Sequence, residues 1–450
     1  MRRLVVLLTI AVPLALGASG AELKLPPEFH AILDLTASVP PEFAAHAILR
    51  MVSSGKIQDK ETRRALCIRA FETAANAHER AMRQAIPGLG GDSAAASLDR
   101  AYRLRLDMVS LQSRAVTLLL HDDKGKAREL FEQIPRPNIP VLTCADALVY
   151  DVSDYAAALH AIVESGFTPA ERAKEDHVAL ILTYLSGITS PSQLVPAARL
   201  ILDSSALTAP QRDLLINRFN GLMEGMSADP RAFAAAAPSL RAILTPAMQV
   251  SFEKLAARTR SAPACGDPNP QAPKVVVGAA AAPGLPMPDT QPFWQSNGSK
   301  AMLAQARKVR FGDNNRTWTD ADRETLDWKD RYHEFIGTLA SWNPDPDEPP
   351  AVYFHERVIL YEGLMDVAPG AAARQSLLED FISFLNSSSL QRDNPPEWFS
   401  VIPEMWHRIP FHDPAERQAC ADALARSGNP VVSLYLALEK TIPQGPGGQR

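Results

Sequence analysis

Five regularly spaced helix starts constrain this chain more than any other feature of its sequence. They lie at Thr168, Ser190, Thr208, Asp229 and Thr245, each with a proline one or two residues later. Proline is favoured in the first turn because its missing N–H would be unpaired there. The first three starts also carry Glu or Gln three residues on, which completes a capping box. The starts are 22, 18, 21 and 16 residues apart, so successive pairs span 40 and 37 residues, the length of a helical hairpin repeat.

The caps and the 40/37 spacing over residues 168–260 resemble α-solenoids of the tetratricopeptide or HEAT kind. The Trp, Leu-Gly and Tyr pattern of tetratricopeptide repeats is absent, so no specific family is matched. The resemblance therefore implies an all-α architecture with an elongated curved surface, and it implies no particular partner.

The first 21 residues predict an export signal. Arg2 and Arg3 are followed by an apolar stretch from Leu4 to Leu16, which is too short to span a bilayer, and Ser19-Gly20-Ala21 is a typical cleavage site. We therefore expect a periplasmic or extracellular protein whose mature chain begins near Glu22. No later stretch is long and apolar enough for an integral membrane segment.

Charge and cysteine content exclude several classes of function. The formal net charge is −5, and loss of the two leader arginines makes it about −7, which argues against a nucleic-acid partner. The four cysteines, Cys67, Cys144, Cys265 and Cys420, form no CxxC motif for zinc or redox chemistry. Cys67 lies on an apolar helical stripe and is expected to be a buried free thiol. Three disulfide pairings remain open.

Composition divides the chain into several regions. The predicted regions are a signal peptide (1–21), a helical repeat domain (22–260), a linker (261–292), a second helical domain (293–442) and a disordered tail (443–450). Eight of the 32 linker residues are proline and seven are alanine, and all six tryptophans follow residue 293. Proline forbids regular helix and removes backbone donors, so this linker is expected to separate two domains. Within the first domain we expect two long helices, at 59–86 and 92–121, and almost no strand.

Signatures of metal and cofactor sites are incomplete. The chain has His-Glu pairs at positions 78, 333 and 355, but none has the second histidine of a zinc protease motif. A calcium-like loop at 313–324 has Trp318 where the sharp turn needs glycine. The glycines at 88–91 follow a predicted helix, whereas a dinucleotide-binding fingerprint follows a strand. We therefore predict no metal and no cofactor.

The segment 394–413 contains the densest group of residues that could do chemistry. Glu397, Glu404 and His407 are the candidate catalytic residues, and two tryptophans accompany them. One interpretation is a sugar or peptide platform with aromatic stacking surfaces. The other is a set of short helices with both tryptophans in the core, and it is favoured because large aromatic residues usually pack inward.

Two functions remain in competition. The first is a non-enzymatic interaction protein that binds an extended protein or peptide partner on a helical-repeat surface, supported by the spacing and by the lack of a complete catalytic signature. The alternative is a secreted all-α enzyme acting on a glycan, such as an α/α-toroid glycosidase or polysaccharide lyase. An open array of helices would favour the first function, and a closed ring with a carboxylate-lined cleft would favour the second.

Overall fold

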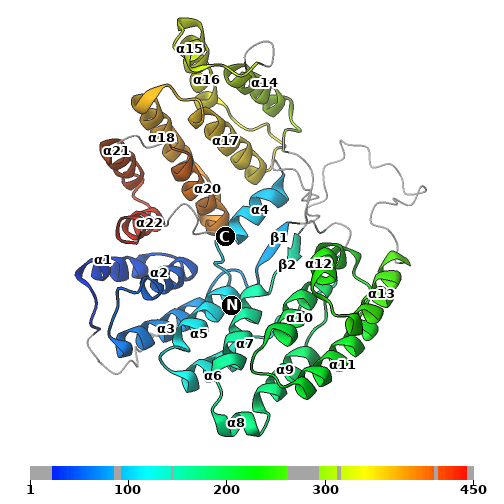
Figure 1. Ribbon diagram of the computed structural model, residues 1–450. Helices are drawn as coiled ribbons and strands as arrows, with labels where there is room; N and C mark the ends of the chain where they lie inside the picture. The colour runs from blue at the N-terminus through cyan, green and yellow to red at the C-terminus, as the bar shows by residue number, and fades with distance from the viewer. Residues whose placement is uncertain are drawn as a thin grey trace, which may run out of the picture.

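The fold is all-α, as the sequence predicts, apart from two short strands (Figure 1). The computed structural model describes residues 23–85, 93–142, 146, 148–261, 293–311, 316–409 and 414–442. The elements before the predicted linker are α1 (Pro27–Leu35), η1 (Thr36–Ser38), α2 (Pro41–Ser53), α3 (Lys60–Ala74), β1 (Arg83–Ala85), α4 (Ala94–Tyr102), α5 (Met108–Leu119), α6 (Lys124–Gln133), β2 (Leu148–Tyr150), α7 (Ser153–Ser165), α8 (Pro169–Ala173), α9 (Asp176–Ser186), η2 (Pro191–Gln193), α10 (Leu194–Asp203), α11 (Ala209–Gly225), α12 (Pro230–Ile243) and α13 (Pro246–Ser261).

The later elements, in the residues that the structure describes from 293 to 442, are all helices. They are α14 (Asn297–Phe311), α15 (Asp320–Arg323), α16 (Leu326–Ser341), α17 (Pro350–Met365), α18 (Gly370–Ser387), α19 (Leu390–Asp393), α20 (Pro395–Arg408), α21 (Pro414–Ala425) and α22 (Pro430–Thr441). Residues 1–21, the tail 443–450 and all of the predicted linker except Ser261 lie outside the described residues. Among the described residues, no helix is long and apolar enough to cross a membrane.

The five helix starts predicted from the sequence are confirmed. Thr168 forms a complete capping box, in which its hydroxyl accepts from the Glu171 N–H and the Glu171 carboxylate accepts from the Thr168 N–H at 2.7 Å. Ser190 caps the short η2 turn that leads into α10, and Asp229 caps α12. The helix after Thr208 begins at Ala209, and α13 begins at Pro246. The caps at Thr168, Ser190 and Asp229 succeed as signals because each satisfies an orphan N–H group within one turn.

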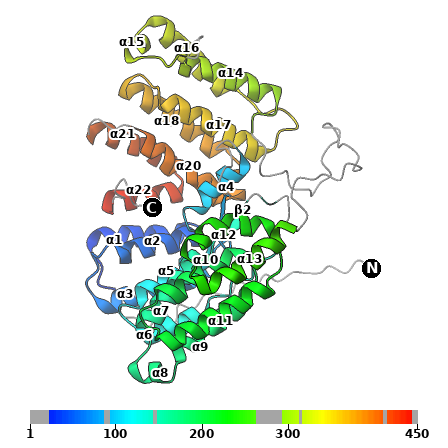
Figure 2. The same ribbon diagram turned by 45° about the vertical axis from the view of Figure 1, so that its right-hand side comes forward.

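The helices form two layers that follow an open arc (Figures 1 and 2). One layer runs through α5, α7, α10 and α12, each packed on the next, and α9, α11 and α13 continue the other. In the later part of the chain, α14, α17 and α20 pack in succession, and α18 packs on α17 and α21. Helix α4 and the two strands lie on the inside of the arc, where α4 contacts α17 and α20 and β2 contacts α12.

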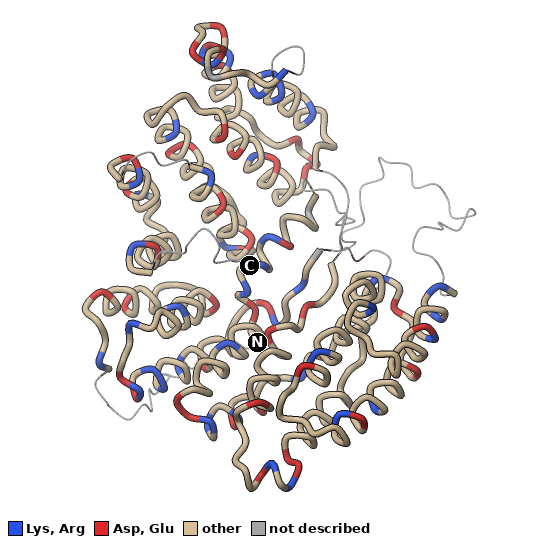
Figure 3. Tube along the Cα trace, viewed as in Figure 1, with Lys and Arg blue, Asp and Glu red and all other residues tan. Residues whose placement is uncertain are grey.

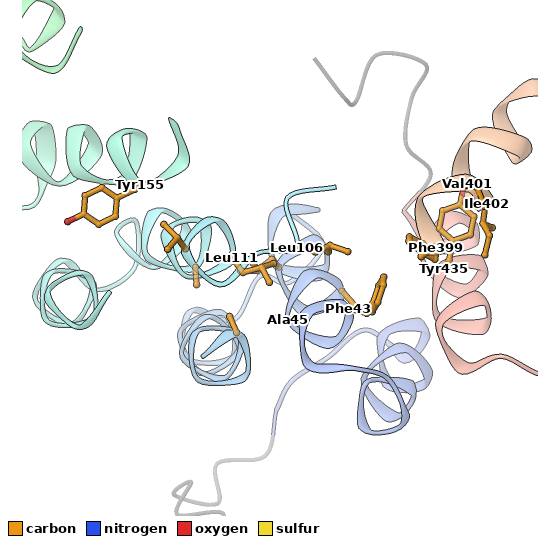
Figure 4. Close-up of a cluster of buried hydrophobic side chains, with 14 of the residues drawn as sticks. Phe43, Ala45, Leu106, Leu111, Tyr155, Phe399, Val401, Ile402 and Tyr435 are labelled. Atoms are coloured by element: carbon orange, nitrogen blue, oxygen red, sulfur yellow. The ribbon is translucent and has the colours of Figure 1, made fainter. Parts of the chain in front are cut away.

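The last helix packs against the first two, so the late part of the chain adjoins the beginning. Helix α22 contacts α1 and α2, and Phe43 of α2 lies edge-on to Phe399 of α20 with ring centroids 5.0 Å apart. Phe399 is in turn 5.7 Å from Tyr435 of α22. Figure 4 shows these rings within the buried cluster. The predicted division into two domains stays a prediction, but the two parts share one contiguous hydrophobic core across this seam.

Two of the predicted helices are wrong in extent. Helix α3 ends at Ala74, and residues 83–85 form a strand that pairs antiparallel with residues 148–150. The expected helix at 92–121 is divided between α4 and α5, because Arg105 takes a left-handed φ of 53° and Asp107 caps α5 through the Ser110 N–H. A three-residue strand is too short to show an alternating pattern, and its stability depends on a partner distant in sequence.

Candidate functional site

A cavity of about 750 Å³ lies where the early and late helices meet on the inside of the arc. We call it the first cavity. Helix α2 contributes His46 and Arg50, the turn between α4 and α5 contributes Arg105, and α5 contributes Arg114. Helices α20 and α22 supply an apolar wall, which includes Phe399. The site is therefore assembled from segments that are far apart in the sequence.

Five arginine side chains line the first cavity, and three of them are neutralised by a carboxylate. Arg50 lies 3.2 Å from Glu439. The other two pairs are Arg103 with Asp99 at 2.5 Å and Arg105 with Asp154 at 2.9 Å. In Figure 3, positive and negative positions are interspersed along the helices, as these pairs illustrate. Most of the charge at the cavity is therefore balanced within the protein.

The remaining two arginines have no carboxylate partner among the described residues. Arg83 donates from Nε and Nη2 to the Tyr102 hydroxyl, at 3.1 and 2.6 Å, and its guanidinium lies over the Tyr102 ring. Arg114 has a single hydrogen-bond contact, from Nη1 to His46 Nδ1 at 3.4 Å. The first cavity thus holds two guanidinium groups whose charge is not paired in the described part of the protein.

Arg114 contributes to the shifted pKa of His46. Burial is the largest cause that lowers the pKa of His46 well below its usual range, and the positive charges of Arg114 and Arg50 add to it. Burial likewise lowers the pKa of Arg114. Since an arginine stays charged in proteins, His46 is the neutral partner of the two. A neutral imidazole with Nδ1 unprotonated accepts a hydrogen bond, so His46 orients the Arg114 guanidinium without opposing its charge.

A second cavity of about 590 Å³ adjoins the first and shares Gln84 and Asp151 with it. It lies against α7, α10, α12 and β2, on the inner layer of the array. Much of its lining consists of small side chains: Ala156, Ala157, Ser192, Ala232, Ala235 and Ala236. Small residues on neighbouring helices leave room between the ridges of larger side chains, and this keeps the surface hollow. The two cavities are neighbours on either side of Gln84 and Asp151, and we call them together the groove.

The three sequence-predicted catalytic residues lie on α20, none of them lines either cavity, and each contacts a different group. Glu397 is buried and accepts hydrogen bonds from Asn394 at 2.7 Å and from His355 Nε2 at 2.5 Å. Glu404 lies 2.6 Å from Arg100, on the contact between α20 and α4. His407 donates from Nδ1 to the Pro403 carbonyl of its own helix at 2.6 Å. Each of the three therefore has a partner within the protein.

The tryptophans of the same segment belong to the core. Trp398 is 1 % exposed and Trp406 is 5 % exposed, and the indole N–H of Trp398 donates to the Leu385 carbonyl. This agrees with the favoured interpretation, in which these rings pack inward. Cys67 is a buried free thiol, as expected, and Cys420 is another, whereas Cys144 and Cys265 lie outside the described residues.

The groove itself was not identified from the sequence. The available signal was the arginine density of the stretch 100–114, which contains Arg100, Arg103, Arg105 and Arg114. The sequence predicts a single helix over 92–121, whereas the turn at Arg105 between α4 and α5 lines the cavity. In the part of the chain that the structure describes, no three His, Cys, Asp or Glu side chains are placed to hold a metal ion.

No protein-family model matches this chain, and no curated protein or solved structure shows significant similarity to it. The function must therefore be inferred from the chemistry and shape of the groove.

Proposed function

We propose that this protein is a non-enzymatic interaction protein that binds an extended peptide segment of a partner in the groove formed by the two cavities. The observation that carries the proposal is that two cavities adjoin each other and share lining residues. The cavities measure about 750 and 590 Å³ and meet at Gln84 and Asp151. A compact small molecule needs one pocket of a few hundred to about 1,000 Å³, whereas a peptide runs along several neighbouring hollows.

The arrangement of the helices also favours an extended ligand. The described helices follow an open arc rather than a closed ring (Figures 1 and 2). The second cavity is lined by α7, α10 and α12, which belong to one layer of this arc. Stacked helices expose similar faces along such a surface, which suits a ligand that is long rather than compact. Glu397, Glu404 and His407 are each bound to another group of the chain, which favours a structural role for them over the alternative of glycan cleavage.

Site-specific photocrosslinking tests the proposal. A benzoylphenylalanine at Ala157, an exposed residue of the second cavity, should crosslink to a peptide of a partner from the native envelope fraction. The matched control is Ala179, which is exposed on α9 and lines neither cavity. Ala235→Trp should abolish the crosslink by filling the hollow, and the far-UV spectrum should stay unchanged.

Two results would contradict the proposal. One is equal crosslinking from Ala157 and Ala179. The other is hydrolysis or lytic cleavage of a glycan or peptide by the purified protein, lost in Glu404→Gln with the fold intact. The second result would instead support the secreted-enzyme alternative.

A further inference from the structure

Arg114 lines the first cavity and forms no ion pair with a carboxylate among the described residues. It is set back in the wall of the first cavity, and burial is the main influence on its pKa. Two carboxylates act on its charge without forming an ion pair with it: Asp154, which pairs with Arg105 at 2.9 Å, and Asp107, which accepts from the Ser110 N–H at 2.9 Å. The cost of burying the guanidinium is therefore only partly offset within the protein, and an anionic ligand in the cavity would offset more of it.

The geometry around Arg114 leaves most of its hydrogen-bonding capacity unused. A guanidinium has five N–H donors in a planar fork, and only the contact from Nη1 to His46 is found among the described residues. That contact fixes one edge of the group. The remaining donors match the two oxygens of a carboxylate, which a guanidinium binds with two parallel hydrogen bonds.

Neighbouring groups define what else the ligand must carry. Arg50 and Arg105 line the same cavity and add positive potential, although each is partly neutralised by its own carboxylate. Phe43 and Phe399 line the same cavity and give it an apolar part. A ligand that fits both walls combines an anionic group with apolar side chains. An acidic peptide meets this description, whereas an acidic polysaccharide lacks the apolar side chains.

We propose that the first cavity is a carboxylate-binding subsite in which Arg114, oriented by His46, binds an Asp or Glu side chain of the peptide partner. This inference rests on the proposed function, because it specifies the chemistry of the partner in the same groove. The second cavity then holds the continuation of the peptide beyond Gln84 and Asp151.

Blocked peptides test the inference by isothermal titration calorimetry with the full mature chain. The probes are repeats of Glu-Ala-Val-Ser, with matched Gln-Ala-Val-Ser and Lys-Ala-Val-Ser peptides. The Glu peptide should bind at least about tenfold more tightly than the Gln peptide, since charge-assisted hydrogen bonds are the strong ones. Arg114→Met should remove this preference and leave binding of the Gln peptide unchanged.

The control is Arg128→Met, which changes the net charge equally at an arginine that lines neither cavity and pairs with Glu171. It should keep the preference for the Glu peptide. If Arg114→Met fails to fold, the preference of the wild-type protein among the three peptides still decides the question.

Different outcomes separate the two proposals. Equal binding of the Glu and Gln peptides, together with crosslinks from Ala157 and none from Ala179, would overturn the carboxylate subsite and leave the peptide groove standing. Absence of both peptide binding and crosslinks would overturn the proposed function itself. Preferential binding of oligogalacturonate over every peptide would overturn the assignment to an acidic peptide.

Discussion

The ion pair between Arg50 and Glu439 should hold the two parts of the chain together, and Glu439→Gln tests this. The pair joins α2 to α22 at 3.2 Å, and its side chains are only 9 % and 6 % exposed. Removing one partner of a buried pair costs about 3–5 kcal/mol, because the other charge stays buried alone. Arg50 Nη2 keeps its hydrogen bond to the Ile442 carbonyl at 2.6 Å, so we expect a loss near the lower bound, about 3 kcal/mol.

The positions of the tryptophans allow urea unfolding of the later part of the chain to be followed separately. All six tryptophans lie between residues 294 and 406, so their fluorescence reports on the later part of the chain, whereas far-UV circular dichroism reports on every helix. In urea the two signals should change together. Their common midpoint should fall by about 1 M in Glu439→Gln, taking an m-value of about 3 kcal/mol per molar urea.

The double variant Arg50→Met/Glu439→Leu is the control. It removes both charges and leaves apolar side chains at the seam, so it should recover much of the lost stability. Unchanged midpoints in Glu439→Gln would refute the reasoning. A circular dichroism curve with two steps, of which only one follows the fluorescence, would instead establish two independently folding domains, as composition alone predicts.

Three further predictions follow from single groups. Thr168→Ala should cost about 1 kcal/mol of stability in urea unfolding, because it removes a capping box; no loss would mean that this cap is redundant. Burial raises the pKa of Asp107 from 3.8 to about 6, so the folded protein binds a proton at this carboxyl more tightly than the unfolded chain does. The wild-type protein therefore loses stability as the pH rises from 3.8 through 6. Asp107→Asn keeps a side-chain cap and has no titrating charge, so its stability relative to the wild type should increase by on the order of 3 kcal/mol at most between thermal unfolding at about pH 4 and at about pH 7.5. A stability difference that does not change with pH would contradict this. Burial raises the pKa of Cys67 to about 12 and that of Cys420 to about 11, so mass spectrometry should find both thiols alkylated by iodoacetamide only after unfolding, and labelling of the native protein would show that they are accessible.

Local signals in the sequence predicted local structure well. The caps at Thr168, Ser190 and Asp229 are found where they were expected, since each depends on hydrogen bonds within one helical turn. Pro27 and Pro41 begin α1 and α2 without a side-chain cap, at a position where a backbone N–H would be unpaired. Whether the array repeats in a regular way stays a prediction.

Features that depend on distant partners could not be predicted. The strand at 83–85 exists through pairing with 148–150, and nothing near Arg83 in the sequence indicates this. The groove is similar, because His46 and Arg114 are 68 residues apart and meet only when α2 packs on α5. Glu397, Glu404 and His407 attracted attention because they are close in sequence, but each has a separate set of contacts in the fold.

The contact of α22 with α1 and α2 has a consequence for the order of events during synthesis. Arg50 and Glu439 are 389 residues apart, so at translation rates of 5–20 residues per second the early helices wait roughly 20–80 s for the helix that covers them. During that interval Phe43, only 4 % exposed in the finished fold, has no α20 or α22 to cover it. A nascent chain of this design needs a holding factor, and a nonsense mutation before α22 should yield aggregates rather than a smaller folded protein.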